Sequence, residues 1–287
     1  MPKIEVIKAV DARVNLNLPV SWKKAGTRPF LRDKESLDTS GSHLRYLFPG
    51  INEREGQGAT PKEMISLMDE ASIEKGIMTI TPENEEAVLK VIAQYPKRFV
   101  GNFTVNPHEG MEAVRKLEKA VKTYPFIKAA KVSAHTIQKP YNDKIYYPVY
   151  AKCVELDIPI TANVGIPAAR VPGECLNPIY LDEVCWFFPE LKVVMNHGGE
   201  PWQFMCVKLM LKWPNLYYMT SAFAPKHYPP EIVQYLNTRG EDKVMFATDY
   251  PTLPWDRCMK EVRDLPLREH VWPKFLRENA MKVFKLE

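Results

Sequence analysis

The 287-residue sequence predicts an α/β fold, a (β/α)8 TIM barrel made by a single domain that spans residues 1–287. Three observations predict it. Short apolar runs alternate with amphipathic segments along most of the chain, eight such runs can be counted, and most are apolar throughout. Continuous apolar runs are typical of strands buried on both faces, and parallel strands need a covering segment in every connection.

The strands and helices of this barrel are expected at regular intervals. The expected strands are residues 6–11, 76–80, 99–105, 127–132, 158–163, 191–196, 216–220 and 244–248. Expected helices include residues 107–123, 141–156, 177–188, 200–211 and 228–237. Two earlier helices begin at Thr60-Pro61 and Thr81-Pro82, where a capping residue precedes a proline and acidic residues. A doubly wound open sheet is the alternative, but no glycine-rich phosphate turn follows the first strand.

Residues 16–60 interrupt the alternation of strands and helices. They contain Pro19, Pro29 and Pro49, several glycines and many charges, without a periodic apolar face. A loop of this length inside a compact domain is usually functional or disordered. Because the segment follows the first strand, and the active site of a barrel forms where its strands end, we expect it to be a lid over the barrel mouth.

Composition and charge narrow the class of protein. Hydrophobic residues make up 45% and charged residues 26%, which are globular values. The net charge of +4, from 39 basic and 35 acidic residues, is too small to predict a nucleic-acid or membrane partner. No apolar stretch reaches the ~18 residues of a membrane span and no secretory signal is visible, so a cytoplasmic location is expected. The five widely spaced cysteines predict buried thiols rather than disulfides or a structural zinc site.

Polar side chains stand where the expected strands end. In a barrel these ends converge on one mouth, and converging polar groups are the usual sign of a site, although a single Asn or Thr there is more often a turn former or helix cap. Ser221 and Cys175 lack a nucleophile elbow, and the absence of a G-x-G-x-x-G turn argues against a nicotinamide cofactor. The converging residues are Arg13, Asn15, Asn106, Lys131, His135, Asn163, Asn196, His197, Thr220, Ser221, Thr248 and Asp249.

Three motifs give the chain a family resemblance. They are His197-Gly-Gly-Glu-Pro-Trp202, Phe246-Ala-Thr-Asp-Tyr-Pro251 and Glu278-Asn-Ala-Met-Lys-Val-Phe284. On these motifs the chain resembles the amidohydrolase-related family, the branch of the amidohydrolase superfamily that contains carboxymuconate-semialdehyde and resorcylate-type decarboxylases. The resemblance covers essentially the whole chain and implies a barrel enzyme with a metal ion at its mouth.

The metal ligands that this resemblance implies are mostly replaced. The family pattern is a His-x-His pair ending the first strand, a His ending the fifth, often a His ending the sixth and an Asp ending the eighth. Because a catalytic zinc commonly keeps three protein ligands, we predict no metal cofactor, with a divalent ion such as zinc as the alternative. The matching positions here hold Arg13, Asn15, Asn163, His197 and Asp249.

Arg13 has two interpretations. Its guanidinium is a permanent cation with a planar fork of donors, so it could replace part of the metal's charge and hold a substrate carboxylate or an oxyanion. It could instead pair with Asp249 and stabilise the barrel, although buried ion pairs are often near neutral for stability.

The predicted function is hydrolysis of an ester or lactone in a small carboxylated, cyclic or aromatic substrate, without a catalytic metal. Asp249 would act as the base and His197 would position the substrate or assist proton transfer. Decarboxylation, with a neutral Asp249 as the acid, is the alternative within the family. A catalytically inactive barrel that binds a ligand is the alternative of another class. The predicted substrate-binding residues are Arg13, Asn15, Lys131, His135, Asn163 and Arg170.

Large aromatic side chains in the second half of the chain predict a homodimer, because they exceed what branched residues need to fill a barrel. A place in the core is the alternative for each of them. They are Trp202, Phe204, Trp213, Tyr217, Tyr218 and Trp272.

Overall fold

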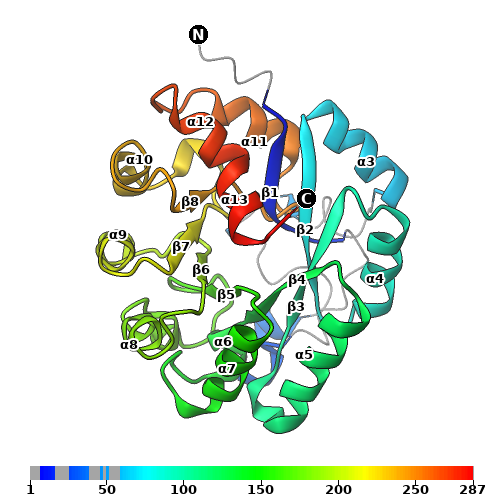
Figure 1. Cartoon of the computed structure of the whole chain (residues 1–287), viewed down its shortest axis with the longest axis vertical. Coiled ribbons are helices and arrows are strands. Elements are labelled where there is room, and N and C mark those ends of the chain that lie inside the picture. The colour runs from blue at the N-terminus through cyan, green and yellow to red at the C-terminus, as the bar shows by residue number, and fades with distance from the viewer. Residues whose placement is uncertain (1–6, 17–25, 39–45, 48–49, 52–58, 287) are drawn as a thin grey trace.

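The protein is a (β/α)8 barrel, as the sequence predicts. A computed structural model describes residues 7–16, 26–38, 46–47, 50–51 and 59–286. Helices surround a ring of strands, and the C-terminal helix α13 (Asn279–Val283) lies against the first strand (Figure 1).

The sheet has eight strands in the order of the chain, and each pairs in parallel with the next. Four of these strands are buried along their whole length and the other four over most of it, which explains their continuous apolar runs. Their bounds are β1 (Ala9–Val14), β2 (Ile73–Ile80), β3 (Phe99–Thr104), β4 (Ile127–Val132), β5 (Ile160–Asn163), β6 (Val193–Asn196), β7 (Leu216–Met219) and β8 (Val244–Met245).

The ring closes between β1 and the segment that follows β8. The amide of Ala12 donates to the carbonyl of Phe246 at 3.0 Å, and the amide of Asp249 donates to the carbonyl of Arg13 at 3.1 Å. Val14 and Tyr250 form a parallel bridge. This closure places the end of the first strand directly beside the end of the last.

Two apolar layers flank the ring. One cluster takes residues such as Val10, Ile77, Ala129, Val194 and Met245 from different strands around the ring, so these side chains meet inside the barrel. Residues of α13 join this cluster. The other cluster packs the outer faces of the strands against the surrounding helices.

The helices are amphipathic and begin at recognisable signals. Thr60 and Glu63 form the predicted capping box at the start of α3, with mutual side-chain to backbone hydrogen bonds of 3.3 and 2.7 Å. The other helices are α1 (Lys34–Leu37), α4 (Glu85–Gln94), α5 (Met111–Thr123), α6 (Ala134–Ile137), α7 (Tyr147–Glu155), α8 (Tyr180–Phe187), α9 (Gln203–Lys212), α10 (Pro230–Leu236), α11 (Trp255–Val262) and α12 (Val271–Pro273), with α3 at Pro61–Glu70.

Several predicted boundaries shift by a few residues; the first strand, for example, is Ala9–Val14 rather than residues 6–11. Two of the differences have a visible cause. Helix α4 begins at Glu85 rather than at Thr81-Pro82, because Asn84 closes a turn with its Oδ1 accepting from the amide of Thr81 at 2.7 Å. Strand β8 ends at Met245 rather than at residue 248. Beyond Met245 the amide of Ala247 donates to Thr220 Oγ1 at 3.1 Å, so a side chain replaces the strand ladder.

Part of the predicted lid, residues 16–60, lies outside the described residues. The described parts contact the loop at the carboxyl end of β5. Arg170 binds Asp33 and Glu35 at 2.9 and 2.8 Å, and the Tyr46 hydroxyl donates to the carbonyl of Ala168 at 2.5 Å. Both contacts lie in the loop that follows β5.

The five cysteines are free and buried, as the sequence predicts. Across the described ranges, every helix is too short or too polar to cross a lipid bilayer.

Candidate active site

The barrel closure brings Arg13 and Asp249 together. Arg13 Nε donates to Asp249 Oδ1 at 2.6 Å, and Asn15 Nδ2 donates to the same oxygen at 2.9 Å. His197 lies on the other side of this carboxylate, with Nδ1 3.9 Å from Asp249 Oδ2. The side chains of Arg13, Asp249 and His197 are 10%, 14% and 21% exposed, so each keeps some contact with solvent at the mouth.

The backbone at the mouth is bent sharply where the last three strands end. His197, Ala222 and Asp249 adopt φ values of 69°, 70° and 73°, in the left-handed region that side chains other than glycine rarely occupy. Gly198 has φ 78°, and a Cβ there would lie 2.1 Å from the ring of Phe223. Strained backbone of this kind tends to collect at functional sites, where surrounding structure holds it. Here the strained backbone directs the side chains of His197 and Asp249 toward each other at the mouth.

A buried carboxylate, Asp11, supports the end of β8. It accepts from the amide of Thr248 at 3.0 Å, from Thr248 Oγ1 at 2.5 Å, from Trp255 Nε1 at 2.8 Å and from the amide of Arg13 at 3.0 Å. Burial raises the pKa of Asp11 to about 6, although these hydrogen bonds act in the opposite direction. Asp11 thereby joins the strand that carries Arg13 to the residue that precedes Asp249.

The charges at the mouth shift one another's protonation. Burial acts to raise the pKa of Asp249, but the Arg13 guanidinium and the other nearby groups outweigh it, so the pKa lies below its usual range and the side chain is a carboxylate. Burial and then the charge of Arg13 hold the pKa of His197 well below its usual range. His197 is therefore a neutral imidazole, and its approach to Asp249 is not an ion pair at neutral pH.

Three further predicted residues stand on neighbouring strands of the mouth. Asn163 Oδ1 accepts from Asn196 Nδ2 at 2.8 Å, which links the ends of β5 and β6. Lys131, near the end of β4, is electrostatically coupled to Arg13, Asp249 and His197. His135, in the short helix α6, is electrostatically coupled to His197.

The structure does not place Arg170 with these residues. Its guanidinium is 39% exposed, pairs with Asp33 and Glu35, and lies 5.0 Å from the ring centre of Tyr46. Arg170 was predicted to donate to an anionic substrate. In the structure its anionic partners are instead two carboxylates of the same chain, Asp33 and Glu35. Arg170 fastens the segment around α1 to the loop after β5.

The aromatic residues that predict a homodimer have different environments. Trp272 and Tyr218 are only 2% and 1% exposed, so these two lie in the core, which was the alternative to a dimer interface. Phe204, in contrast, is 74% exposed. Trp186 and Phe187 of α8 are exposed as well, although they were not among the predicted residues. The homodimer stays a prediction.

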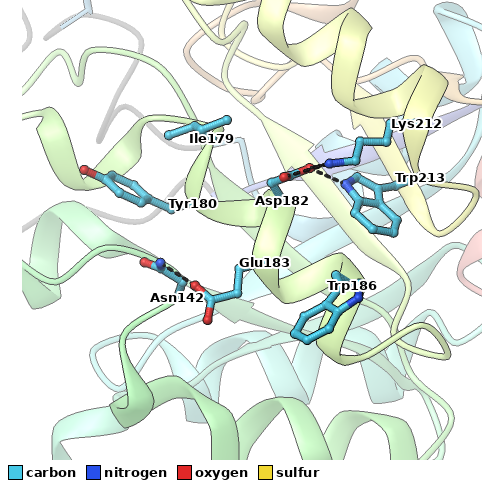
Figure 2. Close-up of a pocket in the computed structure, with 8 residues that line it drawn as sticks. All are labelled: Asn142, Ile179, Tyr180, Asp182, Glu183, Trp186, Lys212 and Trp213. Carbon is cyan, nitrogen blue, oxygen red and sulfur yellow. Dashed lines mark hydrogen bonds and ion pairs between the residues drawn. The ribbon is translucent and has the colours of Figure 1, made fainter.

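A hollow on the outer surface is a second place to consider. It lies beside α8 and the end of α9, and Figure 2 shows its polar side chains directed at one another. Lys212 Nζ donates to both oxygens of Asp182 at 2.8 Å, and Trp213 Nε1 donates to Asp182 Oδ1 at 2.6 Å. Because these groups already satisfy one another, the hollow offers a ligand less than the mouth does.

Comparison with known protein families identifies the class. The family model described as amidohydrolase matches residues 45–286. The chain therefore belongs to the amidohydrolase family, as the resemblance of its motifs implies.

Solved structures with the same fold span essentially the whole chain. An uncharacterized TIM-barrel protein from Bordetella bronchiseptica is 23% identical, with a TM-score of 0.73 and coverage of 98% of this chain and 99% of that one. A 5-carboxyvanillate decarboxylase from Novosphingobium aromaticivorans, complexed with manganese and 4-hydroxy-3-methoxy-5-nitrobenzoic acid, is 18% identical, with a TM-score of 0.72 and coverage of 98% and 97%. A dihydroxybenzoic acid decarboxylase from Polaromonas, with bound manganese and 2-nitroresorcinol, is 18% identical, with a TM-score of 0.66 and coverage of 97% and 96%.

These comparisons contradict the prediction of no metal cofactor, because both decarboxylases are described with bound manganese. The prediction relied on counting His and Asp ligands, whereas manganese also takes carbonyl, water and substrate oxygens, which a sequence does not reveal. The residues of this mouth nevertheless do not fit such an ion. Among the described residues there is no group of three or more His, Cys, Asp or Glu side chains that could hold a metal, and Asp249 Oδ1 already accepts from Arg13 and Asn15.

Sequence reasoning missed Asp11 as a part of the site. It is the last residue of the expected first strand, but its partners Thr248 and Trp255 lie more than two hundred residues away in the chain. An acidic residue inside an otherwise apolar run, two positions before Arg13, was the available signal.

Proposed function

We propose that the protein is a decarboxylase, a C–C lyase that releases CO2 from a small organic acid bound at the barrel mouth. The Arg13 guanidinium is the observation that carries this proposal. The Nε of Arg13 donates to Asp249, while the two terminal nitrogens of Arg13 have no hydrogen-bond acceptor among the described residues. A guanidinium fork with free terminal nitrogens is suited to a carboxylate. Membership of the amidohydrolase family and the likeness to enzymes named as decarboxylases of aromatic acids support it.

The ionised Asp249 limits how the reaction can run. Loss of CO2 leaves an electron pair on carbon that must take up a proton, and a carboxylate cannot supply one. The neutral His197 imidazole can receive a proton from solvent and pass it on, since Asp249 Oδ2 at 3.9 Å favours its transient positive charge. Asp249 then orients Arg13 and stabilises His197 during proton transfer.

Hydrolysis of an ester or lactone is the second candidate, because one observation favours it. Asp249 is a carboxylate at neutral pH and could act as a base toward a water molecule. Arg13 would then stabilise the oxyanion that forms on the attacked carbonyl.

We also propose that residues 16–60 cover the mouth within a single-domain barrel. The ion pairs of Arg170 with Asp33 and Glu35 support this, together with the hydrogen bond from Tyr46 to Ala168. All these contacts lie on the loop after β5, at the carboxyl end of the barrel. Closure of such a segment over a bound acid would exclude water from the reaction.

Release of CO2 from a panel of small acids tests the proposed function. The panel contains hydroxybenzoates, β-keto acids and, for the second candidate, carboxylated esters and lactones, each assayed with and without added manganese. We expect CO2 from at least one acid, and a loss of that activity in Arg13→Met. Arg257→Met is the matched control, because Arg257 makes a similar Nε to carboxylate contact with Glu261 at 2.8 Å on the surface of α11. Cleavage of esters or lactones without any CO2 release would contradict the proposal and favour hydrolysis.

A further inference from the structure

Lys131 is a buried amine that faces the inside of the barrel. It is paired in register with Thr104 of β3 and Thr161 of β5. Asn102 Nδ2 of β3 donates to Thr161 Oγ1 at 2.9 Å across β4, so these side chains share the inner face of the ring. Ala129, two residues before Lys131 and thus on the same face, belongs to the inner cluster. Lys131 is 7% exposed and lies on the strand beside the mouth.

Within the described ranges, no hydrogen bond or ion pair joins the Lys131 amine to another residue. The negative charge that acts on this amine is that of Asp249, whose Oδ1 already accepts from Arg13 and Asn15. A buried ammonium without a partner is costly, and the fixed positive charge of Arg13 adds to that cost. Burial and Arg13 accordingly hold the pKa of Lys131 well below its usual range. The geometry and the charges agree that the side chain is a neutral amine rather than a second cation.

Lys243 is a half-buried lysine of the same protein whose contacts are purely structural. Its Nζ donates to the carbonyls of Trp213 and Leu216 at 3.2 Å each and also to that of Pro214. Burial lowers the pKa of Lys243 to about 8, yet its amine is fully occupied by backbone carbonyls. Lys131 lacks any such set of acceptors. A structural role alone therefore does not explain why a lysine stands at this position.

The lining around Lys131 is polar and incompletely hydrogen-bonded. Four buried oxygens in the described structure have no hydrogen-bond partner, and β2, β3 and β6 carry them on the inner face of the ring. Unpaired buried polar atoms are expected where a ligand or water supplies the missing bonds. They are Thr79 Oγ1, Asn102 Oδ1, Thr104 Oγ1 and Asn196 Oδ1.

We propose that Lys131 is a catalytic nucleophile that forms an imine with the ketone carbonyl of a β-keto acid whose carboxylate is held by Arg13. The inference rests on the proposed decarboxylation and names its substrate class. A neutral, desolvated lysine beside another cationic group is the form that attacks carbonyl carbon. The oxygens of Thr104 and Asn102 are placed to hydrogen-bond the hydroxyl and N–H groups that appear during the reaction.

The reaction balances without an oxidant or a reductant. The Lys131 nitrogen bonds to the ketone carbon, a proton is taken up from solvent, and the ketone oxygen leaves as water, which gives a protonated imine. The bond to the carboxylate carbon then breaks, CO2 leaves and its electron pair moves toward the iminium nitrogen to give an enamine. The enamine carbon takes a proton delivered through His197, and water returns the ketone product and the free amine. The sum is β-keto carboxylate plus one proton giving ketone and CO2.

Reductive trapping tests the proposal on the whole chain. The protein is treated with borohydride in the presence of acetoacetate, a small β-keto acid, and with oxaloacetate and acetonedicarboxylate in parallel, and its peptides are examined by mass spectrometry. We expect the reduced adduct on the peptide that contains Lys131 and loss of CO2 release after trapping. The peptide that contains Lys243 serves as the internal control and should carry no adduct above that of surface lysines.

Variants separate this inference from the proposed function. Lys131→Met and Lys131→Arg should both lose the adduct and at least a hundredfold of CO2 release, with melting temperatures that report whether each variant is folded. CO2 release from hydroxybenzoates but not from the keto acids would overturn the imine while leaving decarboxylation intact. Absence of adduct at Lys131 with all three keto acids would overturn it as well. If no acid of any class loses CO2, the proposed function fails first.

Discussion

The two sides of the barrel mouth differ in how completely their polar groups are hydrogen-bonded. On the β1–β8 side, defined by Asp11, Arg13, Asn15, Thr248 and Asp249, four donors converge on Asp11 and two on Asp249 Oδ1. On the β3–β6 side, the Lys131 amine and the oxygens of Asn102, Thr104 and Asn196 have no hydrogen-bond partner among the described residues.

This difference indicates that the two sides of the mouth have different roles. A buried polar group without a partner costs about 1–3 kcal/mol, so the β3–β6 side carries a cost that a bound ligand or water could remove. On the β1–β8 side the carboxylates of Asp11 and Asp249 already accept from several donors, which fixes the geometry of Arg13 and Asp249 before anything binds, while the terminal nitrogens of Arg13 stay open for a substrate carboxylate. Preorganised charges of this kind stabilise a reacting group without having to move. We infer that one side positions the carboxylate and the other receives the reacting carbonyl.

The largest expected effect is on turnover, in Asp249→Asn. The change keeps the shape and one acceptor for Arg13 but removes the charge that supports proton transfer at His197, so the rate of CO2 release should fall by about 10²–10⁴-fold. Affinity for a substrate acid, measured by calorimetry, should remain measurable. A variant with near-normal turnover would place the proton transfer on the β3–β6 side instead.

Arg13→Met tests whether the β1–β8 side binds the acid or only braces the barrel. Loss of a charge-assisted contact in a desolvated site should weaken the binding of an acid by on the order of 2–5 kcal/mol. Affinity and the free energy of unfolding are measured on the same variant, with the surface Arg257→Met as the control. Unchanged affinity together with a stability loss of several kcal/mol would make Arg13 only the structural partner of Asp249.

The fold, and the meeting of side chains from different strand ends at one mouth, were predictable because both follow from local patterns. Continuous apolar runs indicate parallel buried strands, and barrel topology brings the residues at their ends together, which located Arg13, His197 and Asp249. The same patterns gave the capping box at Thr60 and Glu63. Each of these signals lies within a few residues of the feature that it predicts.

What sequence reasoning missed depends on contacts between distant segments. Arg170 stands in a loop where a substrate donor is plausible, but its partners Asp33 and Glu35 lie about 135 residues earlier in the chain. Lys131 was predicted as a substrate-binding residue, and only the folded structure shows that burial and Arg13 oppose its charge. The metal prediction failed for a related reason, because oxygen ligands from the backbone, water or substrate leave no trace in a residue pattern.

Asp11→Asn tests how the protonation of Asp11, on the β1–β8 side, contributes to the free energy of unfolding. Because the folded pKa of about 6 lies above the usual 3.8, protonation favours the folded state, so this contribution is present below about pH 4 and is lost as the pH rises through 6. The free energy of unfolding of wild type relative to Asp11→Asn should therefore fall by roughly 2 kcal/mol from pH 4 to pH 7. Urea titrations of wild type and Asp11→Asn at each pH across this range measure it.

The smallest effect is expected for Thr104→Val on the β3–β6 side. Its Oγ1 is buried and has no partner among the described residues, so a methyl group of similar size should change the free energy of unfolding by less than about 1 kcal/mol. Thr220→Val is the matched control, because Thr220 Oγ1 accepts from the Tyr228 hydroxyl at 2.8 Å and from the amide of Ala247 at 3.1 Å. Losing those bonds leaves two buried donors unpaired and should cost about 1–3 kcal/mol. If Thr104→Val proves as destabilising as Thr220→Val, the Thr104 hydroxyl is hydrogen-bonded within the protein. The β3–β6 side would then have a structural role rather than a ligand-binding one.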